Sequence, residues 1–104
     1  MLVVSGHLRI DPNNLEIAKK AMQEVMTETH KEAGNISYVF THTLDEPGHF
    51  RIFEEWDSQD ALDAHMKAPH MAVFGKAMGG FGVTEILIKR YQVGEIDTLL
   101  EKGS

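Results

Sequence analysis

Two histidines, His65 and His70, lie on either side of Pro69 and are the first residues whose types suggest chemistry. An imidazole changes charge at about pH 6.5, and it can therefore transfer a proton or orient a substrate. A histidine at a break between helices also commonly caps carbonyl groups, so a structural role is the alternative. The spacing of five residues with an intervening proline differs from the i, i+4 spacing of a helical metal site. We therefore expect no metal.

A pair of adjacent carboxylates, Glu54 and Glu55, precedes the only tryptophan, Trp56. Consecutive residues of a strand point to opposite faces, so one of the two carboxylates faces the interior and needs a partner. We expect that partner to be a cation in a structural ion pair. The candidate cations are Arg51, Lys89 and Arg90.

A third histidine, His7, stands within an alternating segment between Ser5 and Arg9. It faces either a ligand pocket or a seam between subunits, and the sequence favours neither. The large apolar residues of the second half are also ambiguous, because a stripe at helical spacing forms core or pocket wall. These residues are Phe53, Trp56, Met71, Phe74 and Met78.

The elements that must position these residues are read from hydrophobic periodicity and from turn residues. Alternation and β-branched or aromatic content predict strands, and a 3.6-residue period predicts helices. The expected strands are 2–10, 36–44, 49–56 and 82–91. The expected helices are 15–33, one capped by Ser58 that ends near 66, and one that restarts at Pro69 and ends at Gly79.

The order of these elements is β-α-β-β-α-β, which predicts an α+β, ferredoxin-like fold with a four-stranded antiparallel sheet and a second helix broken at Pro69. Several strands carry bulky apolar residues on both faces, so the face away from the helices needs a cover. A second copy of the chain is the simplest cover, and we expect a homodimer. Residues 1–91 form the domain, and residues 92–104 form a tail that we expect to cross to the partner subunit.

Composition narrows the class of protein. The chain has 104 residues, 10 Lys and Arg against 16 Asp and Glu, a net charge of −6 and no cysteine. An acidic chain of this kind argues against a nucleic-acid partner, and the absence of cysteine excludes disulfides and thiolate chemistry. We expect neither a signal peptide nor a membrane segment, and hence a cytoplasmic protein.

The stretch FEEWDSQDALDAHMKAPHMAVF, residues 53–74, resembles the signature of antibiotic biosynthesis monooxygenase (ABM) domains. It is most similar to their quinol monooxygenase branch. The shared pattern is a strand ending in E-x-W, a serine cap, an Ala-Leu helix, and H-x4-H-M before an aromatic residue. Gly34 and Tyr38 fit as well, and the resemblance extends to about Tyr91.

This resemblance implies a dimeric α/β-barrel arrangement and a cofactor-independent monooxygenase. The substrate would be a small phenol or quinol-type aromatic, oxidised by molecular oxygen in an apolar pocket between sheet and helices. On this basis we expect His70, His65 and His7 as catalytic residues. The expected substrate-binding residues are Tyr38, Phe53, Trp56, Met71, Phe74 and Met78.

Two rival functions compete with this interpretation. A heme-degrading branch shares the fold, but its characteristic Asn, Trp and axial His positions fall on His7, Ala64 and Phe74, which disfavours heme. The remaining alternative is a non-catalytic dimeric domain that binds a small molecule or acts in stress protection, because one fold hosts many functions.

Overall fold

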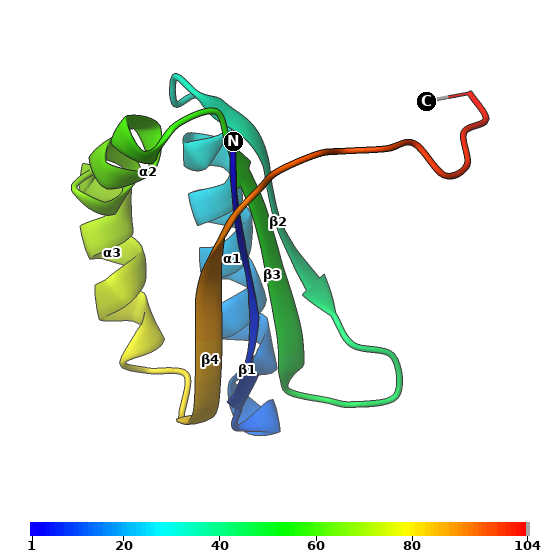
Figure 1. Cartoon of the computed structure of the whole chain (residues 1–104). Coiled ribbons are helices and arrows are strands. Elements are labelled where there is room, and N and C mark those ends of the chain that lie inside the picture. Colours follow the sequence, from blue (N-terminus) through cyan, green and yellow to red (C-terminus); the bar gives the residue numbers. More distant parts are fainter. Residues whose placement is uncertain (104) are drawn as a thin grey trace.

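The computed structural model describes residues 1–103 and contains a four-stranded antiparallel sheet with its helices on one face (Figure 1). The sheet order is β2-β3-β1-β4, which is the predicted ferredoxin-like arrangement. The second helix is divided at Pro69, as expected. The elements are β1 (Leu2–Ile10), the 3-10 helix η1 (Pro12–Asn14), α1 (Leu15–Thr29), β2 (Asn35–His42), β3 (His49–Trp56), α2 (Gln59–Met66), α3 (Pro69–Met78) and β4 (Val83–Gln92).

The two-residue period of β1 divides the sheet into two faces. Its even-numbered residues from Leu2 to Ile10 are buried under the helices, whereas the odd-numbered ones are only partly buried. Across the sheet, Val4 pairs with Glu54 of β3 on one side and with Arg90 of β4 on the other. Directly paired residues share a face, so all three belong to the side covered by helices.

The first helix ends earlier than its hydrophobic stripe predicts. We expected it to continue to residue 33, but α1 ends at Thr29 and the chain turns over residues 30–34. Gly34 completes this turn with a φ of +83°, a backbone conformation that glycine adopts without strain. The turn frees Glu32 to point toward α2 and α3, where it has hydrogen-bonding partners. Within residues 1–103, no helix is long and apolar enough to cross a membrane.

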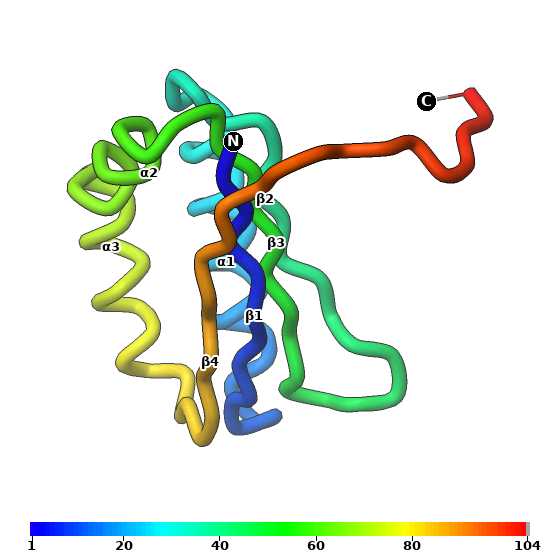
Figure 2. Tube along the Cα trace, in the orientation of Figure 1, coloured from blue at the N-terminus to red at the C-terminus, as the bar shows by residue number. Residues whose placement is uncertain are grey.

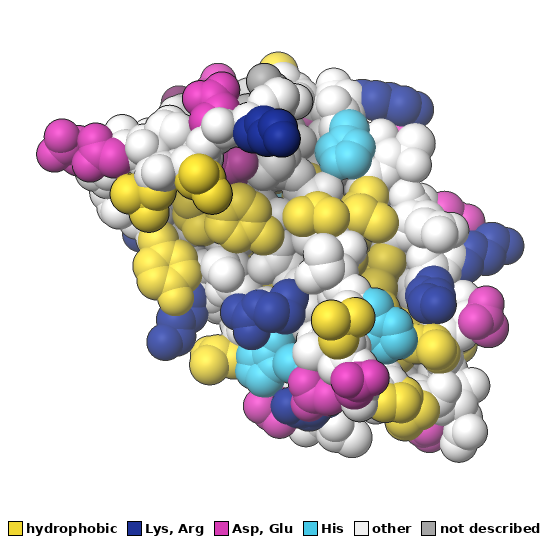
Figure 3. Space-filling model, turned by 90° about the vertical axis from the view of Figure 1, so that its right-hand side faces the viewer, with side chains coloured by type: hydrophobic (Ala, Val, Ile, Leu, Met, Phe, Trp, Pro, Cys, Tyr) yellow, Lys and Arg dark blue, Asp and Glu magenta, His cyan; other side chains and the backbone are white. Residues whose placement is uncertain are grey.

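The face of the sheet opposite the helices is uncovered and partly apolar. Figure 3 views the side of the molecule away from α2 and α3, and apolar side chains lie there among charged and histidine side chains. The large apolar residues exposed on this open face are Val39, Phe53, Leu87 and Tyr91. Bulky residues on both faces of the strands are therefore confirmed.

Beyond β4 the described chain has no helix or strand and extends away from the domain (Figures 1 and 2). Three of its apolar residues, Ile96, Leu99 and Leu100, are exposed, the last two at 95% and 92%. Ser104, the last residue of the predicted tail, lies outside the described residues.

The turn at Gly34 gives a first prediction. A Cβ at this position would lie 2.5 Å from Ala61 Cβ and 2.6 Å from Asp57 Oδ1, and the positive φ adds strain. We expect Gly34→Ala to lower the free energy of unfolding by roughly 1–3 kcal/mol. A Cβ added at Gly75 in α3 would meet nothing within 4 Å. Gly75→Ala should therefore raise the free energy of unfolding by up to about 1 kcal/mol. Urea denaturation of both variants tests this, and shifts of the same sign would contradict it.

Candidate active site

A cavity of about 380 Å³ lies between the helix-covered face of the sheet and the helices α2 and α3. Its walls are mostly apolar, with a few polar groups, which is the usual character of a small-molecule site. The apolar lining residues are Val4, Tyr38, Phe40, Ile52, Leu62, Met66, Met71, Phe74, Met78, Ile86 and Ile88. The polar ones are Glu54, Gln59, Asp63, His65, Lys89 and Arg90.

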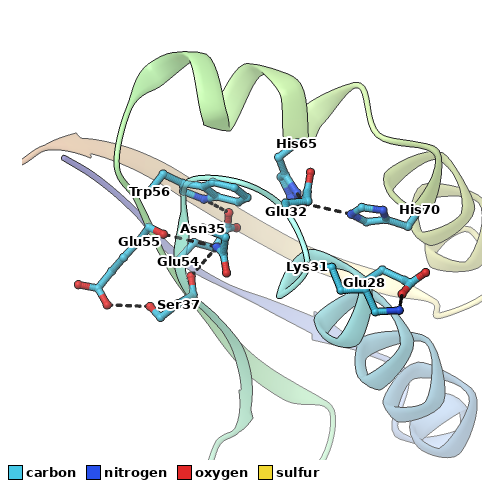
Figure 4. Close-up of polar contacts among 10 residues, drawn as sticks. All are labelled: Glu28, Lys31, Glu32, Asn35, Ser37, Glu54, Glu55, Trp56, His65 and His70. Carbon is cyan, nitrogen blue, oxygen red and sulfur yellow. Dashed lines mark hydrogen bonds and ion pairs between the residues drawn. The ribbon is translucent and has the colours of Figure 1, made fainter.

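Glu54 places a carboxyl group in the wall of this cavity. It is 7% exposed, and Trp56 Nε1–H donates a hydrogen bond to its Oε1 at 2.9 Å (Figure 4). Burial raises the pKa of Glu54 to about 7; the Trp56 hydrogen bond opposes this shift and the charge of Glu32 adds to it. A carboxyl group with this pKa exchanges a proton near neutral pH, which suits a general acid or base.

The structural ion pair predicted for the buried carboxylate is wrong. Within residues 1–103, the contacts of Glu54 include no ion pair with a lysine or arginine. Arg51 pairs with His7 on the open face, whereas Arg90 shares the face of Glu54 but lies on the far side of Val4. Two strand spacings of about 4.8 Å separate the backbones of Glu54 and Arg90, and both residues line the cavity.

Two of the predicted histidines meet at one carboxylate. Glu32 Oε2 lies 2.6 Å from His65 Nδ1 and 3.1 Å from His70 Nε2 (Figure 4). The side chain of His65 is 1% exposed and packs against the rings of Trp56 and Tyr38, with centroids 4.7 and 5.3 Å away. Burial lowers the pKa of His65, while its bond to Glu32 opposes that shift.

The predicted site residues divide between the cavity and other places. Five of the residues expected at the site line the cavity, namely Tyr38, His65, Met71, Phe74 and Met78. Trp56 is completely buried behind the wall, where it contacts Glu54 and His65. His70 does not line the cavity, but it contacts His65, which does, both through Glu32 and directly, with ring centroids 5.9 Å apart.

Two predicted site residues, Phe53 and His7, lie on the other face of the sheet. Phe53 is opposite Ser5 on the open face and is 42% exposed, because its odd position in β3 points away from the helices. His7 also lies on the open face, where its Nδ1 is 2.8 Å from His49 Nε2 and its Nε2 is 3.3 Å from Glu85. Neither lines the cavity within one chain, so the placement of Phe53 in the pocket is wrong and His7 belongs to the open face.

Glu32 was not among the residues predicted for the site, and Glu54 was predicted only as half of a structural ion pair. Glu32 is 33 residues from His65 along the chain, and only the turn after α1 brings it there. The alternation of side chains along β3 could have identified Glu54 as the buried carboxylate. Ile52, Glu54 and Trp56 share one face of the strand, and the other two are large and apolar.

A larger hollow of about 670 Å³ lies at the other end of the molecule, where β1 and β4 meet the β2–β3 loop. Its one arginine, Arg9, is already paired with Glu46 and Glu85 at 3.1 and 3.3 Å. Its lining has no buried titratable group, and its apolar wall is smaller than that of the cavity beside Glu54. The cavity beside Glu54 is therefore the better candidate for a small-molecule site.

Comparison with known proteins agrees with this fold. Residues 1–77 match the family model of the antibiotic biosynthesis monooxygenases. A crystal structure from Deinococcus radiodurans superposes with a TM-score of 0.90 at 26% identity and covers 97% of this chain and 100% of that chain. That protein is assigned to the same monooxygenases only provisionally.

Other solved structures support the fold alone, since their identity is lower. A Caulobacter crescentus protein aligns with a TM-score of 0.84 at 23% identity, over 90% of each chain. A Nitrosomonas europaea protein aligns with a TM-score of 0.83 at 18% identity, over 89% of this chain and 98% of its own. Both carry the same provisional assignment. No curated protein matches the chain.

The buried carboxyl predicts a dependence of stability on pH. In the unfolded chain Glu54 loses its proton near its ordinary pKa of 4.5, but in the folded protein it keeps the proton until about pH 7. The unfolded state therefore binds fewer protons across this window, and the contribution of Glu54 to stability falls as pH rises from 4.5 to 7. Glu54→Gln removes this contribution and keeps an acceptor for Trp56.

We expect the stability of the wild type, measured relative to Glu54→Gln, to decrease by up to about 3 kcal/mol between those pH values and then level off. Urea denaturation of both proteins from pH 4.5 to 8 measures the difference. If the difference in free energy of unfolding between the two proteins stayed constant from pH 4.5 to 8, this prediction would be wrong.

Proposed function

The chain belongs to the antibiotic biosynthesis monooxygenase family, and we propose that it is a cofactor-independent monooxygenase for a small phenol or quinol-type aromatic. The observation that carries this proposal is Glu54, a carboxyl group with a pKa of about 7 in the wall of an apolar cavity. An aromatic ring fits the Met and Phe walls, and its hydroxyl group finds a proton acceptor there.

The proposed reaction begins when Glu54 removes the proton of the substrate hydroxyl. The resulting phenolate is rich enough in electrons to reduce molecular oxygen by one electron, and the two radicals combine at the ring. One oxygen atom enters the substrate and the other leaves as water, while the aromatic supplies all the electrons and becomes a quinone. Arg90, across the cavity from Glu54, can stabilise the negative charge that develops on oxygen.

The histidines support this chemistry in different ways. In this proposal His65 positions the Tyr38 and Trp56 rings that flank the substrate and the carboxyl group. His70 acts on the site through His65, which it contacts directly and also through Glu32. Catalytic roles for His65, His70 and His7 stay predictions from the sequence.

Oxygen consumption with a panel of hydroquinones and phenols tests the proposal. We expect Glu54→Gln to lower kcat by about a hundredfold with a smaller change in KM, because it removes the base and leaves the walls intact. Glu24→Gln is the matched control. Glu24 is an exposed carboxylate on α1, outside both the cavity and the open face, so kcat should stay within about twofold.

Equal oxygen consumption by wild type and Glu54→Gln would remove Glu54 from the reaction. Binding without oxygen uptake would instead favour a small-molecule-binding domain. Such binding is detectable as quenching of Trp56, the only tryptophan in the chain.

We further propose that the working unit is a homodimer joined through the open faces of two sheets, with the tail of each chain lying across its partner. The exposed apolar side chains on this face support it, because an uncovered patch of this kind is costly in water. The exposed Ile96, Leu99 and Leu100 supply further apolar area for the same interface.

Light scattering at micromolar concentration should give twice the chain mass of 11.7 kDa. We expect Phe53→Glu on the open face to yield a monomer, because it buries a charge in the proposed interface. Val73→Glu is the control, since Val73 is 64% exposed on α3 and outside that face. A wild-type monomer, or equal effects of the two variants, would contradict the dimer.

A further inference from the structure

Three side chains of metal-ligand type converge where the turn after α1 meets α2 and α3. They are Glu32, His65 and His70, and their ligand atoms all lie within 4.8 Å of one another. We propose that these three residues bind one divalent transition-metal ion, of the class represented by Zn²⁺. The spacing of the two histidines alone predicted no metal, but the fold adds the carboxylate of Glu32 to them.

The geometry of the contacts favours a common centre. Both imidazoles direct a nitrogen at the same atom, Glu32 Oε2, at 2.6 and 3.1 Å. An ion with ligand bonds of about 2.0–2.1 Å in tetrahedral geometry needs ligand atoms about 3.3 Å apart. Small side-chain rotations by His65 and His70 would open that space.

A second histidine cluster in the chain shows the contrast. On the open face, His7 uses Nδ1 for His49 and Nε2 for Glu85, and His49 then uses its own second nitrogen for Glu46. Its contacts run in a line and alternate between the two nitrogens of each ring. Three ligand atoms do not converge on one point among these described residues, so we expect no comparable ion at that cluster.

The ligand set selects the class of ion. Two imidazoles and one carboxylate suit Zn²⁺, Fe²⁺, Co²⁺ and Ni²⁺, whereas Mg²⁺ and Ca²⁺ prefer sites made of oxygen alone. The side chains of Glu32 and His70 are 17% and 20% exposed, so an ion can arrive from solvent and a water molecule can complete its coordination.

The position of the site suggests what the ion does. Glu32 belongs to the turn after α1, His65 to α2 and His70 to α3, so one ion would join three separate segments of the chain. Only His65 also lines the cavity, and Glu32 and His70 lie outside its wall. The ion would therefore fix the His65 side of the cavity without contacting the substrate.

The test is metal binding by the whole chain, stripped with a chelator and titrated with Zn²⁺ by calorimetry and with Co²⁺ by visible absorption. We expect one ion per chain, Co²⁺ bands typical of coordination by four or five ligands, and a rise in thermal midpoint on addition of Zn²⁺. Glu32→Gln and His70→Gln should each lower the affinity at least about tenfold, because each removes a ligand.

His49→Gln, at the linear cluster, is the matched control and should keep the wild-type affinity. Both ligand variants affect partly exposed side chains, and their thermal midpoints without metal show whether the fold is intact. Absence of stoichiometric Zn²⁺ and Co²⁺ binding by the wild type overturns the proposal. So does binding that survives His70→Gln but is lost in His49→Gln.

Discussion

The burial of the Glu54 carboxyl group is the constraint on which the rest of the site depends. A carboxylate loses much of its hydration in an apolar wall, and here the indole N–H of Trp56 donates a hydrogen bond to it. A cation next to it would have kept the group ionised. Because the immediate contacts of Glu54 within residues 1–103 include no such cation, burial brings its pKa to about 7. The fold thus places a proton acceptor in the wall of the same cavity that can hold an aromatic ring.

Two features of the sheet place Glu54 in the cavity wall: the alternation of side chains between the two faces of each strand, and the order of the strands. The central strands β1 and β3 place Val4 beside Glu54, and β4 adds Arg90 on the far side of Val4. The helices α2 and α3 cover the same face, and their Met and Phe side chains line the cavity. The opposite face keeps Phe53 and His7, which do not line this cavity within one chain and lie instead on the face that the proposed homodimer would cover.

Much of this could be predicted from the sequence, since periodicity and turn residues locate the four strands and three α-helices to within a few residues, although the short 3-10 helix Pro12–Asn14 was not predicted. The predicted pocket nevertheless combined Phe53 with Trp56, although two residues three positions apart on a strand point to opposite faces. Glu32 could not be predicted, because its role depends on where α1 ends and on the positive φ of Gly34. Contacts between segments more than thirty residues apart leave no local pattern in a single sequence.

The protonation state of Glu54 is the most direct measure of this account. Carbon-13 NMR of the side-chain carboxyl carbons, with Glu54→Gln used to assign the resonance, follows the titration of this one group in the folded protein. We expect a midpoint close to pH 7, well above the ordinary 4.5. A midpoint near 4.5 would mean that the carboxyl group is solvated or paired, and the cavity would then lack the proton acceptor on which the proposed oxidation depends.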